Sequence, residues 1–423
     1  MSQINYTFEN KITQLVQRNA EIDKMIIDGL LNISETIGNT FYVSNDGNDA
    51  NDGYTQATAL ATIGKALNKV SRSCRHVTVY LAGGTYDENV ILHNSFVQFD
   101  LQGDVTITGD LDLRMESVVS VISSNNAKFT ADYIRSFALS RLVFNSCSVE
   151  ATSIIAQTGS LITLLDTVNS CTLHPGDAIS AIHAASNAII DNSARVTSIV
   201  GANAASVCSA NGSGLIYWSS PTATITGSFT GAIFFALNNS YMSVSGNNIS
   251  STASISQGIN CQYGSYVVIG VTITVSNCTG QLAYVYANSI VQIGSSITFT
   301  RSGSTAVGMI YAGRHSTFTY GAATLRISAS NCTNFFNADP QGLIEFGGNA
   351  TLILNGSVTA STANVARNGV ITIPTTTSIS GTVTGKRYAA TSGGIINVGG
   401  AGANRIPGSI AGTTNSSAFG FYG

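Results

Sequence analysis

Carboxylate side chains are the groups in this sequence that could carry acid–base chemistry, and their distribution is uneven. The chain has 22 Asp and Glu residues among 423, but beyond Asp191 only Asp339 and Glu345 remain. Cleavage of a glycosidic bond needs two carboxyl groups about 5 to 9.5 Å apart, one as acid and the other as nucleophile or base. The residues that could supply such a pair are therefore few: Asp166, Asp177, Asp191 and Glu345.

Each of these carboxylates also has a structural explanation. Asp177 ends a His-Pro-Gly-Asp sequence that is typical of a turn, and Glu345 falls at an outward-facing position. Asp191 falls in an otherwise apolar column, where a carboxylate needs a partner or a local shift of register. Asp166 precedes Asp191 by about one sequence repeat, which would bring the two together. A catalytic pair, within one chain or between chains, and purely structural acids both remain open.

A pattern repeated ten times between Ser160 and Val398 determines where these acids lie. In each repeat the second and fourth residues after a small or polar start are almost always apolar, and the third is mostly polar. Such alternation indicates a strand with one buried face, and its recurrence at a fixed period predicts a parallel β-helix. The starts, 24 to 27 residues apart, are Ser160, Asn187, Gly214, Ser240, Ser265, Ser289, Ser316, Gly342, Gly369 and Gly394.

The composition agrees with an all-β solenoid made in a reducing cytoplasm. Charged residues make up 10% of the chain, well below the usual share of about 25%. The seven cysteines are scattered without a CxxC motif, which indicates reduced thiols. The first residues lack an apolar signal-peptide core and no 18-residue apolar run occurs, so neither secretion nor a membrane span is expected.

Metal, cofactor and nucleophile chemistry find no support in the sequence. The five histidines have no metal-ligand spacing with each other or with cysteine, and no Gly-x-Ser-x-Gly motif occurs. We therefore expect no metal, no cofactor and no nucleic-acid partner.

Residues 1–40 differ from the rest of the chain. Apolar residues from Phe8 to Ile33 alternate at spacings of four and three, with Asn19 in the same seam. The pattern predicts a short helix that joins several chains, with packing of an amphipathic helix on its own chain as the alternative.

Residues 41–150 begin with a recognisable series of short motifs. A strand from Phe41 is followed by an Asp-Gly-Asn-Asp turn at Asp46, an Ala-Thr-Ile segment at 61–63 and a Gly-Thr-Tyr turn at 84–86. This series resembles the opening of pectate-lyase-like right-handed β-helix proteins. The resemblance implies a right-handed β-helix with a helical cap, but not an activity, because that fold carries lyases, hydrolases and adhesins. The acids at 46–52 do not fit the spacing of a calcium loop and are expected to form a solvated turn.

The last segment, residues 385–423, is rich in glycine. Its Gly-Lys-Arg-Tyr at 385–388 and the glycines of 399–402 are similar to the C-terminal ends of bacteriophage tail fibre and tailspike proteins, although its final residues match that pattern only loosely. The resemblance implies a homotrimeric virion protein that attaches to the phage tail or baseplate through its N-terminal segment and binds a receptor through the shaft at 151–384.

The shaft also contains residues suited to binding a glycan. Through Asp191 the charge balance is −9, and beyond it the balance is +6, so the distal half should attract anionic glycans. Tyr217 at an outward position, with Arg314 and His315 at a corner, are the expected exposed contacts. A column of aromatic residues is expected to form a stack inside the solenoid, with a platform for sugars as the alternative. Its members are Phe235, Tyr284, Tyr311, Phe336 and Tyr388.

These observations predict a receptor-binding protein of the tail fibre or tailspike class, located in the virion, that recognises lipopolysaccharide or capsule during host adsorption. The scarcity of acids disfavours the first alternative, a polysaccharide depolymerase of the same fold. The distal charge disfavours the second, a purely structural tail or baseplate component.

Overall fold

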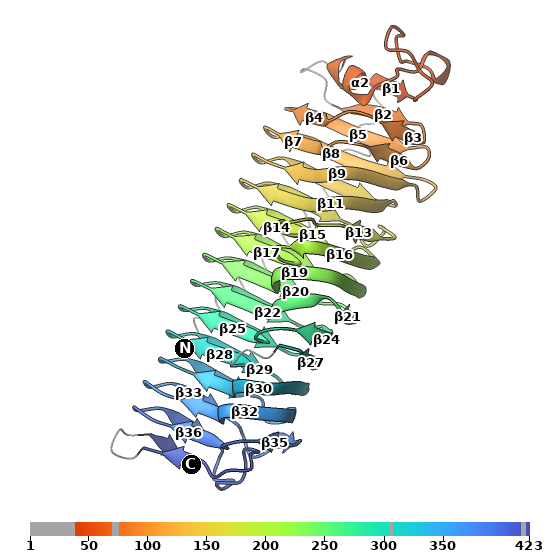
Figure 1. Cartoon of the computed structure of the whole chain (residues 1–423). Coiled ribbons are helices and arrows are strands. Elements are labelled where there is room, and N and C mark those ends of the chain that lie inside the picture. The colour runs from red at the N-terminus through yellow and green to blue at the C-terminus, as the bar shows by residue number, and fades with distance from the viewer. Residues whose placement is uncertain (1–38, 70–75, 304–307, 416–419) are drawn as a thin grey trace.

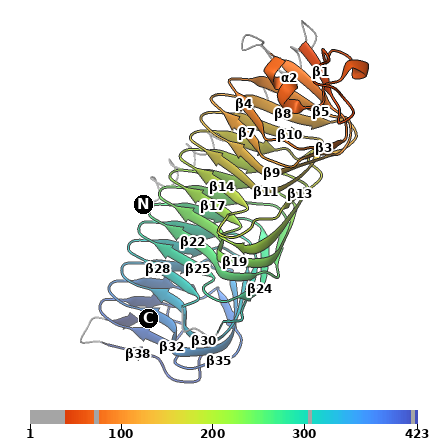
Figure 2. The same cartoon turned by 45° about the horizontal axis from the view of Figure 1, so that its top comes forward.

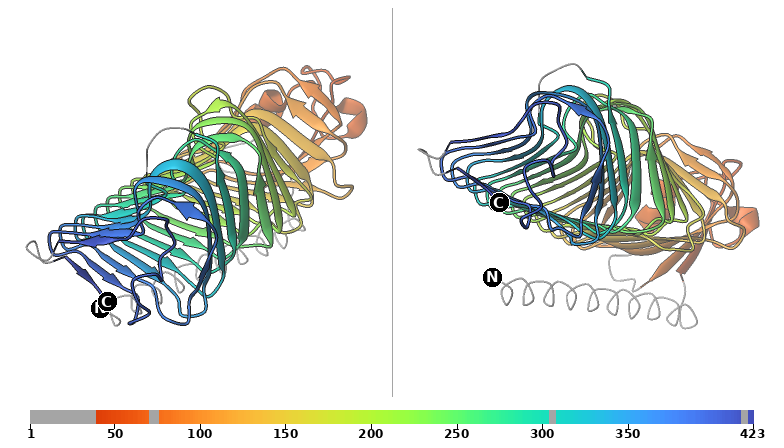
Figure 3. Two further views of the ribbon diagram at one scale, coloured as in Figure 1. Left: turned by 60° about the horizontal axis from the view of Figure 1, so that its bottom comes forward. Right: turned by 90° about the horizontal axis from the view of Figure 1, so that it is seen from below.

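The computed structural model describes residues 39–69, 76–303, 308–415 and 420–423. They form a right-handed parallel β-helix, which confirms the predicted fold class (Figure 1). Successive coils stack along one axis as nearly parallel loops (Figure 2), and seen close to that axis they follow one another's outline (Figure 3). The oligomerising helix predicted within residues 1–40 lies outside the described residues.

One strand of each coil joins a single 16-stranded parallel sheet, here called the long sheet. Its members, in spatial and sequence order, are β1 (Asn39–Val43), β2 (Val77–Leu81), β5 (Phe96–Leu101), β8 (Val118–Ser123), β10 (Arg141–Asn145), β12 (Leu161–Leu164), β15 (Ile189–Asn192), β18 (Leu215–Trp218), β20 (Tyr241–Val244), β23 (Tyr266–Ile269), β26 (Ile290–Ile293), β29 (Thr317–Tyr320), β31 (Leu343–Phe346), β33 (Val370–Thr372), β37 (Ile395–Asn397) and β39 (Phe421–Tyr422).

The remaining strands close the coil, and the longest of them bend, so that β19 pairs with both β21 and β22 of the next coil. These strands are β3 (Gly84–Tyr86), β4 (Val90–His93), β6 (Val105–Ile107), β7 (Leu111–Arg114), β9 (Lys128–Ser136), β11 (Ser148–Gln157), β13 (Cys171–Leu173), β14 (Ile182–Ala185), β16 (Val196–Ala204), β17 (Cys208–Asn211), β19 (Thr222–Leu237), β21 (Asn248–Ser251), β22 (Ser254–Gln262), β24 (Thr272–Cys278), β25 (Ala283–Tyr286), β27 (Ile297–Arg301), β28 (Ile310–Gly313), β30 (Thr324–Ala338), β32 (Thr351–Val365), β34 (Ser378–Ser380), β35 (Val383–Thr384), β36 (Tyr388–Ala390) and β38 (Thr413–Thr414).

The core lies inside the coils, because alternate residues of each strand point inward. On the long sheet, Phe318 pairs in register with Ile344, which pairs with Ile371, and all three are fully buried. Inward apolar side chains therefore stack on their counterparts one coil away, about 4.8 Å apart. This columnar packing explains why the second residue after each start is apolar.

Each coil turns into the long sheet through a corner of left-handed residues. Ala287 and Asn288 have φ of 57° and 61°, and Arg314 and His315 one coil later have 49° and 62°. The corner backbones bond to each other, as the Asn288 N–H donates to the Arg314 carbonyl at 2.9 Å. Two successive left-handed residues are costly for most side chains, so the stacked hydrogen bonds must hold the corner in this conformation.

Small residues follow the corner because the next coil approaches closely there. A Cβ on Gly342 would lie 1.9 Å from the Ala312 carbonyl oxygen. In other coils serine occupies this position. The Ser240 N–H donates to the Ser265 hydroxyl, and the Ser265 N–H donates to the Ser289 hydroxyl, each at 3.2 Å. This serine ladder pairs buried N–H groups that the corner would otherwise leave unsatisfied.

The coil that contains Asp191 departs from its predicted register by one residue. Its small residue is Ala188, because Asn187 adopts a left-handed φ of 63° as part of the corner. Ile190 and Asn192 therefore point inward, and Asp191 points outward. Of the two alternatives for Asp191, a buried partner or a local shift of register, the structure has the shift. The shift is favourable because a buried amide finds hydrogen-bond partners more readily than a buried carboxylate finds a counter-charge.

The expected internal aromatic stack is wrong for three of its five members, because Phe235 shares the outward register column of Tyr284 and Tyr311. Phe336 points inward and is 1% exposed, but Tyr284 and Tyr311 lie on the outer surface, where their rings stack at 5.1 Å. The reason is again register, since Tyr311 pairs with Asn337 rather than with the residue before it. Two tyrosines expected in the core are therefore surface residues.

A short cap that contains the helix α2 (Ile63–Lys69) covers the N-terminal end of the described part of the β-helix. The Glu88 carboxylate accepts hydrogen bonds from the first two N–H groups of α2, both at 2.7 Å. Asp49 accepts from the two preceding N–H groups at 2.9 and 3.0 Å, so its carboxylate stabilises the turn. A 3-10 turn, η1 (Gln56–Thr58), separates β1 from α2. The segments 41–150, 151–384 and 385–423 all contribute strands to the long sheet.

Two adjacent valines test the assignment of inward and outward positions. Val267 is fully buried, whereas Val268, its neighbour in β23, points outward. We expect Val267→Asp to lower the free energy of unfolding by more than about 4 kcal/mol, and Val268→Asp by less than about 1 kcal/mol. Denaturation of the two variants measures this difference, and equal losses would contradict the assignment.

Candidate functional site

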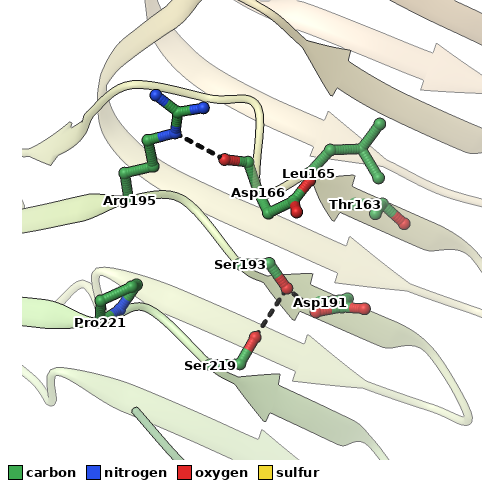
Figure 4. A pocket seen from close by; sticks show the side chains of 8 residues that line it. All are labelled: Thr163, Leu165, Asp166, Asp191, Ser193, Arg195, Ser219 and Pro221. Carbon is green, nitrogen blue, oxygen red and sulfur yellow. Dashed lines mark hydrogen bonds between the residues drawn. The ribbon is translucent and has the colours of Figure 1, made fainter. Parts of the chain in front are cut away.

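Two of the predicted acids line one hollow on the outside of the β-helix. The hollow has a volume of about 360 Å³ and lies where β12, β15 and β18 end and turn out of the long sheet (Figure 4). Its lining consists of Thr163, Leu165, Asp166, Asp191, Ser193, Arg195, Ser219 and Pro221. We call it the acid hollow. Asp166 and Asp191, which the sequence places about one repeat apart, both line this hollow.

Hydrogen bonds hold the polar lining of the acid hollow in place. The Ser193 hydroxyl donates to Asp191 Oδ1 at 3.0 Å and lies 2.7 Å from the Ser219 hydroxyl of the next coil. Arg195 Nε donates to the backbone carbonyl of Asp166 at 3.0 Å, so the guanidinium lies over this end of the hollow. Carboxylates, hydroxyls and a guanidinium around one concavity can accept from and donate to the hydroxyl groups of a sugar.

Thr163 adds a buried hydroxyl beneath the acid hollow. The residue pairs in register with Asp191 and is only 5% exposed, and its Oγ1 has no hydrogen-bond partner in the structure. A buried hydroxyl without a partner costs about 1 to 3 kcal/mol. The polar groups that a ligand in the hollow can reach are therefore the side chains of Asp166, Asp191, Ser193 and Arg195.

A row of three tyrosines begins one coil beyond Asp191. Tyr217 pairs in register with Asp191, and its ring lies 5.8 Å from Tyr241, which lies 5.6 Å from Tyr266. Interplanar angles of 50° and 55° tilt each ring against the next, so the faces are not closed by parallel stacking. We call Tyr217, Tyr241 and Tyr266 the tyrosine row.

The tyrosine row also carries hydroxyl groups that form hydrogen bonds. Tyr266 donates its hydroxyl to Gln292 Oε1 at 2.6 Å. Burial raises the pKa of Tyr217 well above its usual value, with smaller contributions from Tyr241 and Asp191. The Tyr217 hydroxyl therefore stays protonated and can donate a hydrogen bond at neutral pH.

The structure does not place Asp177 or Glu345 in the acid hollow. Asp177 is exposed in the turn between β13 and β14, and His174 of the same turn lies 3.5 Å from Glu150. Glu345 is exposed on the outer face of β31, between two threonines in register. Asp339 forms an ion pair with Arg367. Of the predicted acids, only Asp166 and Asp191 line the acid hollow.

Arg314 and His315 lie at a different place from Tyr217. Both are exposed at the corner between β28 and β29, and the Arg314 guanidinium lies 5.0 Å from the ring centroid of Tyr286. The predicted contacts therefore divide between two surfaces. Sequence reasoning missed Tyr241 and Tyr266, although both directly follow the serine starts of successive repeats.

Other chemistry finds no site in the described part of the chain. No group of three or more His, Cys, Asp or Glu side chains there could hold a metal ion, and none of its helices has the length and apolarity needed to cross a membrane. Burial raises the pKa of the Cys147 and Cys171 thiols to about 12, so neither is a reactive thiolate at neutral pH.

Comparison with known proteins assigns the chain to no family. No protein-family model, curated protein or solved structure matches the chain. The chain is a parallel β-helix protein, and what it binds must be inferred from its surface.

Two buried threonines test whether the Thr163 hydroxyl lacks a partner within the folded chain. Thr163→Val removes an unpartnered hydroxyl and should raise the free energy of unfolding by up to about 1 kcal/mol. Thr197→Val removes a fully buried hydroxyl that donates to Ser220 at 3.0 Å, so it should lower that free energy by about 1 to 3 kcal/mol. Denaturation of both variants measures the opposite signs. Equal destabilisation would show that Thr163 has a partner within the folded chain.

Proposed function

We propose that this protein is a receptor-binding protein that recognises a bacterial surface glycan through the acid hollow and the tyrosine row. The observation that carries the proposal is a hollow with a polar lining, next to which Tyr217 pairs in register with Asp191. The lining groups that can bond to a ligand are those of Asp166, Asp191, Ser193 and Arg195.

The two parts of the surface complement the two sides of a sugar. The apolar face of a sugar ring can lie on an aromatic side chain, as in the tyrosine row, while its hydroxyls bond to carboxylates and hydroxyls such as those of Asp166, Asp191 and Ser193. Together the hollow and the row extend over successive coils along the axis. This shape suits an oligosaccharide that lies along the β-helix.

The assignment to a phage tail fibre or tailspike rests on the sequence resemblances at 41–86 and 385–402 and on the suitability of a rigid rod for that role. In this proposal the protein is made in the host cytoplasm, resides in the virion and attaches to the tail or baseplate through its N-terminal segment. The shaft then presents the glycan site, in lipopolysaccharide or capsule, during host adsorption.

Assembly into a homotrimer forms part of the proposal. Ile395 and Phe421 pair in register on the outer face of the last long-sheet strands, and they are 40% and 58% exposed. Adjacent exposed apolar side chains on a sheet face favour burial against another subunit.

A second candidate function is cleavage of the bound glycan. The observation that favours it is the placement of Asp166 and Asp191 in one hollow, since two carboxylates are what glycoside hydrolysis requires. In a purely structural tail component, by contrast, neither the hollow nor the tyrosine row would have a ligand.

Tyrosine substitutions test the proposed site. Tyr217→Ala or Tyr241→Ala should weaken binding to host polysaccharide about tenfold, because each removes an aromatic face. Tyr133→Ala, in β9 on another side of the coil, serves as the matched control and should leave binding unchanged. Surface plasmon resonance on immobilised polysaccharide measures the affinities. Full binding by both tyrosine-row variants would contradict the proposal.

The same preparations separate binding from cleavage. Asp166→Asn and Asp191→Asn should retain most of the binding, because the amide oxygen still accepts hydrogen bonds from sugar hydroxyls. An assay for new reducing ends or unsaturated sugars should detect no release by the unmodified protein. Sugar release that stops in an Asn variant with normal binding would establish the depolymerase instead.

Light scattering tests the assembly. The intact chain should give the mass of three chains, and Ile395→Asp with Phe421→Asp should weaken the association because two charges enter the proposed interface. Ser378→Asp, an exposed position in β34 of the preceding coil, provides the control. A monomer mass for the intact chain would rule the trimer out.

A further inference from the structure

Three residues of neighbouring coils lie against one another along the corner edge of the β-helix. The ring of Tyr286 lies between Tyr263, whose ring meets it edge-on at 6.4 Å and 86°, and Arg314, whose guanidinium carbon lies 5.0 Å from its centroid. Tyr263 is 50% exposed and Arg314 is exposed. We call Tyr263, Tyr286 and Arg314 the corner notch.

The stacking of the corners brings Tyr263 and Arg314 to the same edge. Tyr263, Ala287 and Arg314 occupy equivalent left-handed corner positions in three successive coils. Tyr263 and Arg314 are thus two coils, about 10 Å, apart along the axis, and the Tyr286 ring lies between them.

Further aromatic rings support the floor of the notch. Tyr284 stacks on Tyr286 at 5.7 Å and on Tyr311 at 5.1 Å, with interplanar angles of 22° and 11°. Parallel stacking covers the faces of these rings and leaves little freedom to the floor. The notch therefore presents a preorganised aromatic surface beside a cation.

The electrostatic surroundings leave the charge of Arg314 uncompensated. Its nearest acid in sequence, Asp339, is already paired with Arg367, and among the described residues Arg314 forms no ion pair. Beyond Asp191 the chain has eight basic residues and two acids. An anion would thus meet an attractive field at this corner.

We propose that the corner notch is a second glycan site, distinct from the acid hollow, and that it selects sugars carrying an anionic group. The Arg314 guanidinium binds the carboxylate or phosphate of the sugar, and the exposed ring of Tyr263 contacts its apolar face. The proposal shares with the proposed function only the class of ligand, because the notch uses none of the residues of the hollow or the row.

Titration of the intact protein with three oligosaccharides of equal length tests the ligand chemistry. An oligogalacturonate carries carboxylates, a phosphorylated malto-oligosaccharide carries phosphate, and an unmodified malto-oligosaccharide is neutral. We expect at least one anionic probe to bind ten or more times tighter than the neutral one, and the preference to shrink between 0.05 and 0.5 M salt. The anionic probe that binds identifies the group. Equal affinity for all three would overturn the proposal.

Variants locate the site. Arg314→Ala should abolish the anionic preference, Arg314→Lys should retain part of it because the charge stays while the planar fork is lost, and Tyr286→Leu should weaken all binding at the notch. Arg326→Ala, an exposed arginine in β30 on another side of the coil, is the matched control. Thermal melts confirm that each variant is folded.

The outcomes distinguish this site from the acid hollow. Tyr217→Ala should leave the binding of the anionic probe unchanged. Loss of that binding in Tyr217→Ala but not in Arg314→Ala would overturn the corner notch and leave the proposed function intact. Equal effects of Arg314→Ala and Arg326→Ala would show that the preference reflects overall charge and would likewise overturn it.

Discussion

Every coil of this protein depends on hydrogen bonding between equivalent backbone positions of its neighbours. A strand inside the stack has its N–H and C=O groups paired on both sides, and the corners continue that pairing through left-handed residues. Where the corner would leave an N–H unpaired, the serine ladder from Ser240 to Ser316 supplies a hydroxyl. The register of one coil is thereby imposed on the next, and all side-chain columns follow from it.

The same register creates the proposed binding surfaces. Because the backbone pairing is satisfied within the stack, outward side chains are free to vary, and residues about 25 positions apart become neighbours. Asp191 beside Tyr217, and Tyr263 beside Tyr286, are contacts of this kind. A β-helix thus builds extended sites from single residues contributed by many coils, which suits ligands that are themselves polymers.

The charge distribution separates the two proposed sites. The acid hollow lies in the last coils that contain several carboxylates, whereas the corner notch lies in the distal half, where basic residues outnumber acids. A glycan with neutral and anionic sugars could therefore contact both surfaces through different chemistry. The β-helix keeps the distance between the sites constant because one continuous sheet connects them.

The sequence by itself determined the fold class and most inward positions, because a repeated period-2 pattern allows only one face of each strand to be buried. It also predicted that Asp166 and Asp191 would meet across one coil. Only the tertiary structure decided that Asp191 points outward and that Tyr284 and Tyr311 lie on the surface, because a one-residue shift at a corner exchanges the two faces of a strand. The contacts of Tyr286 with Tyr263 and Arg314 likewise depend on how three corners stack, which no local pattern records.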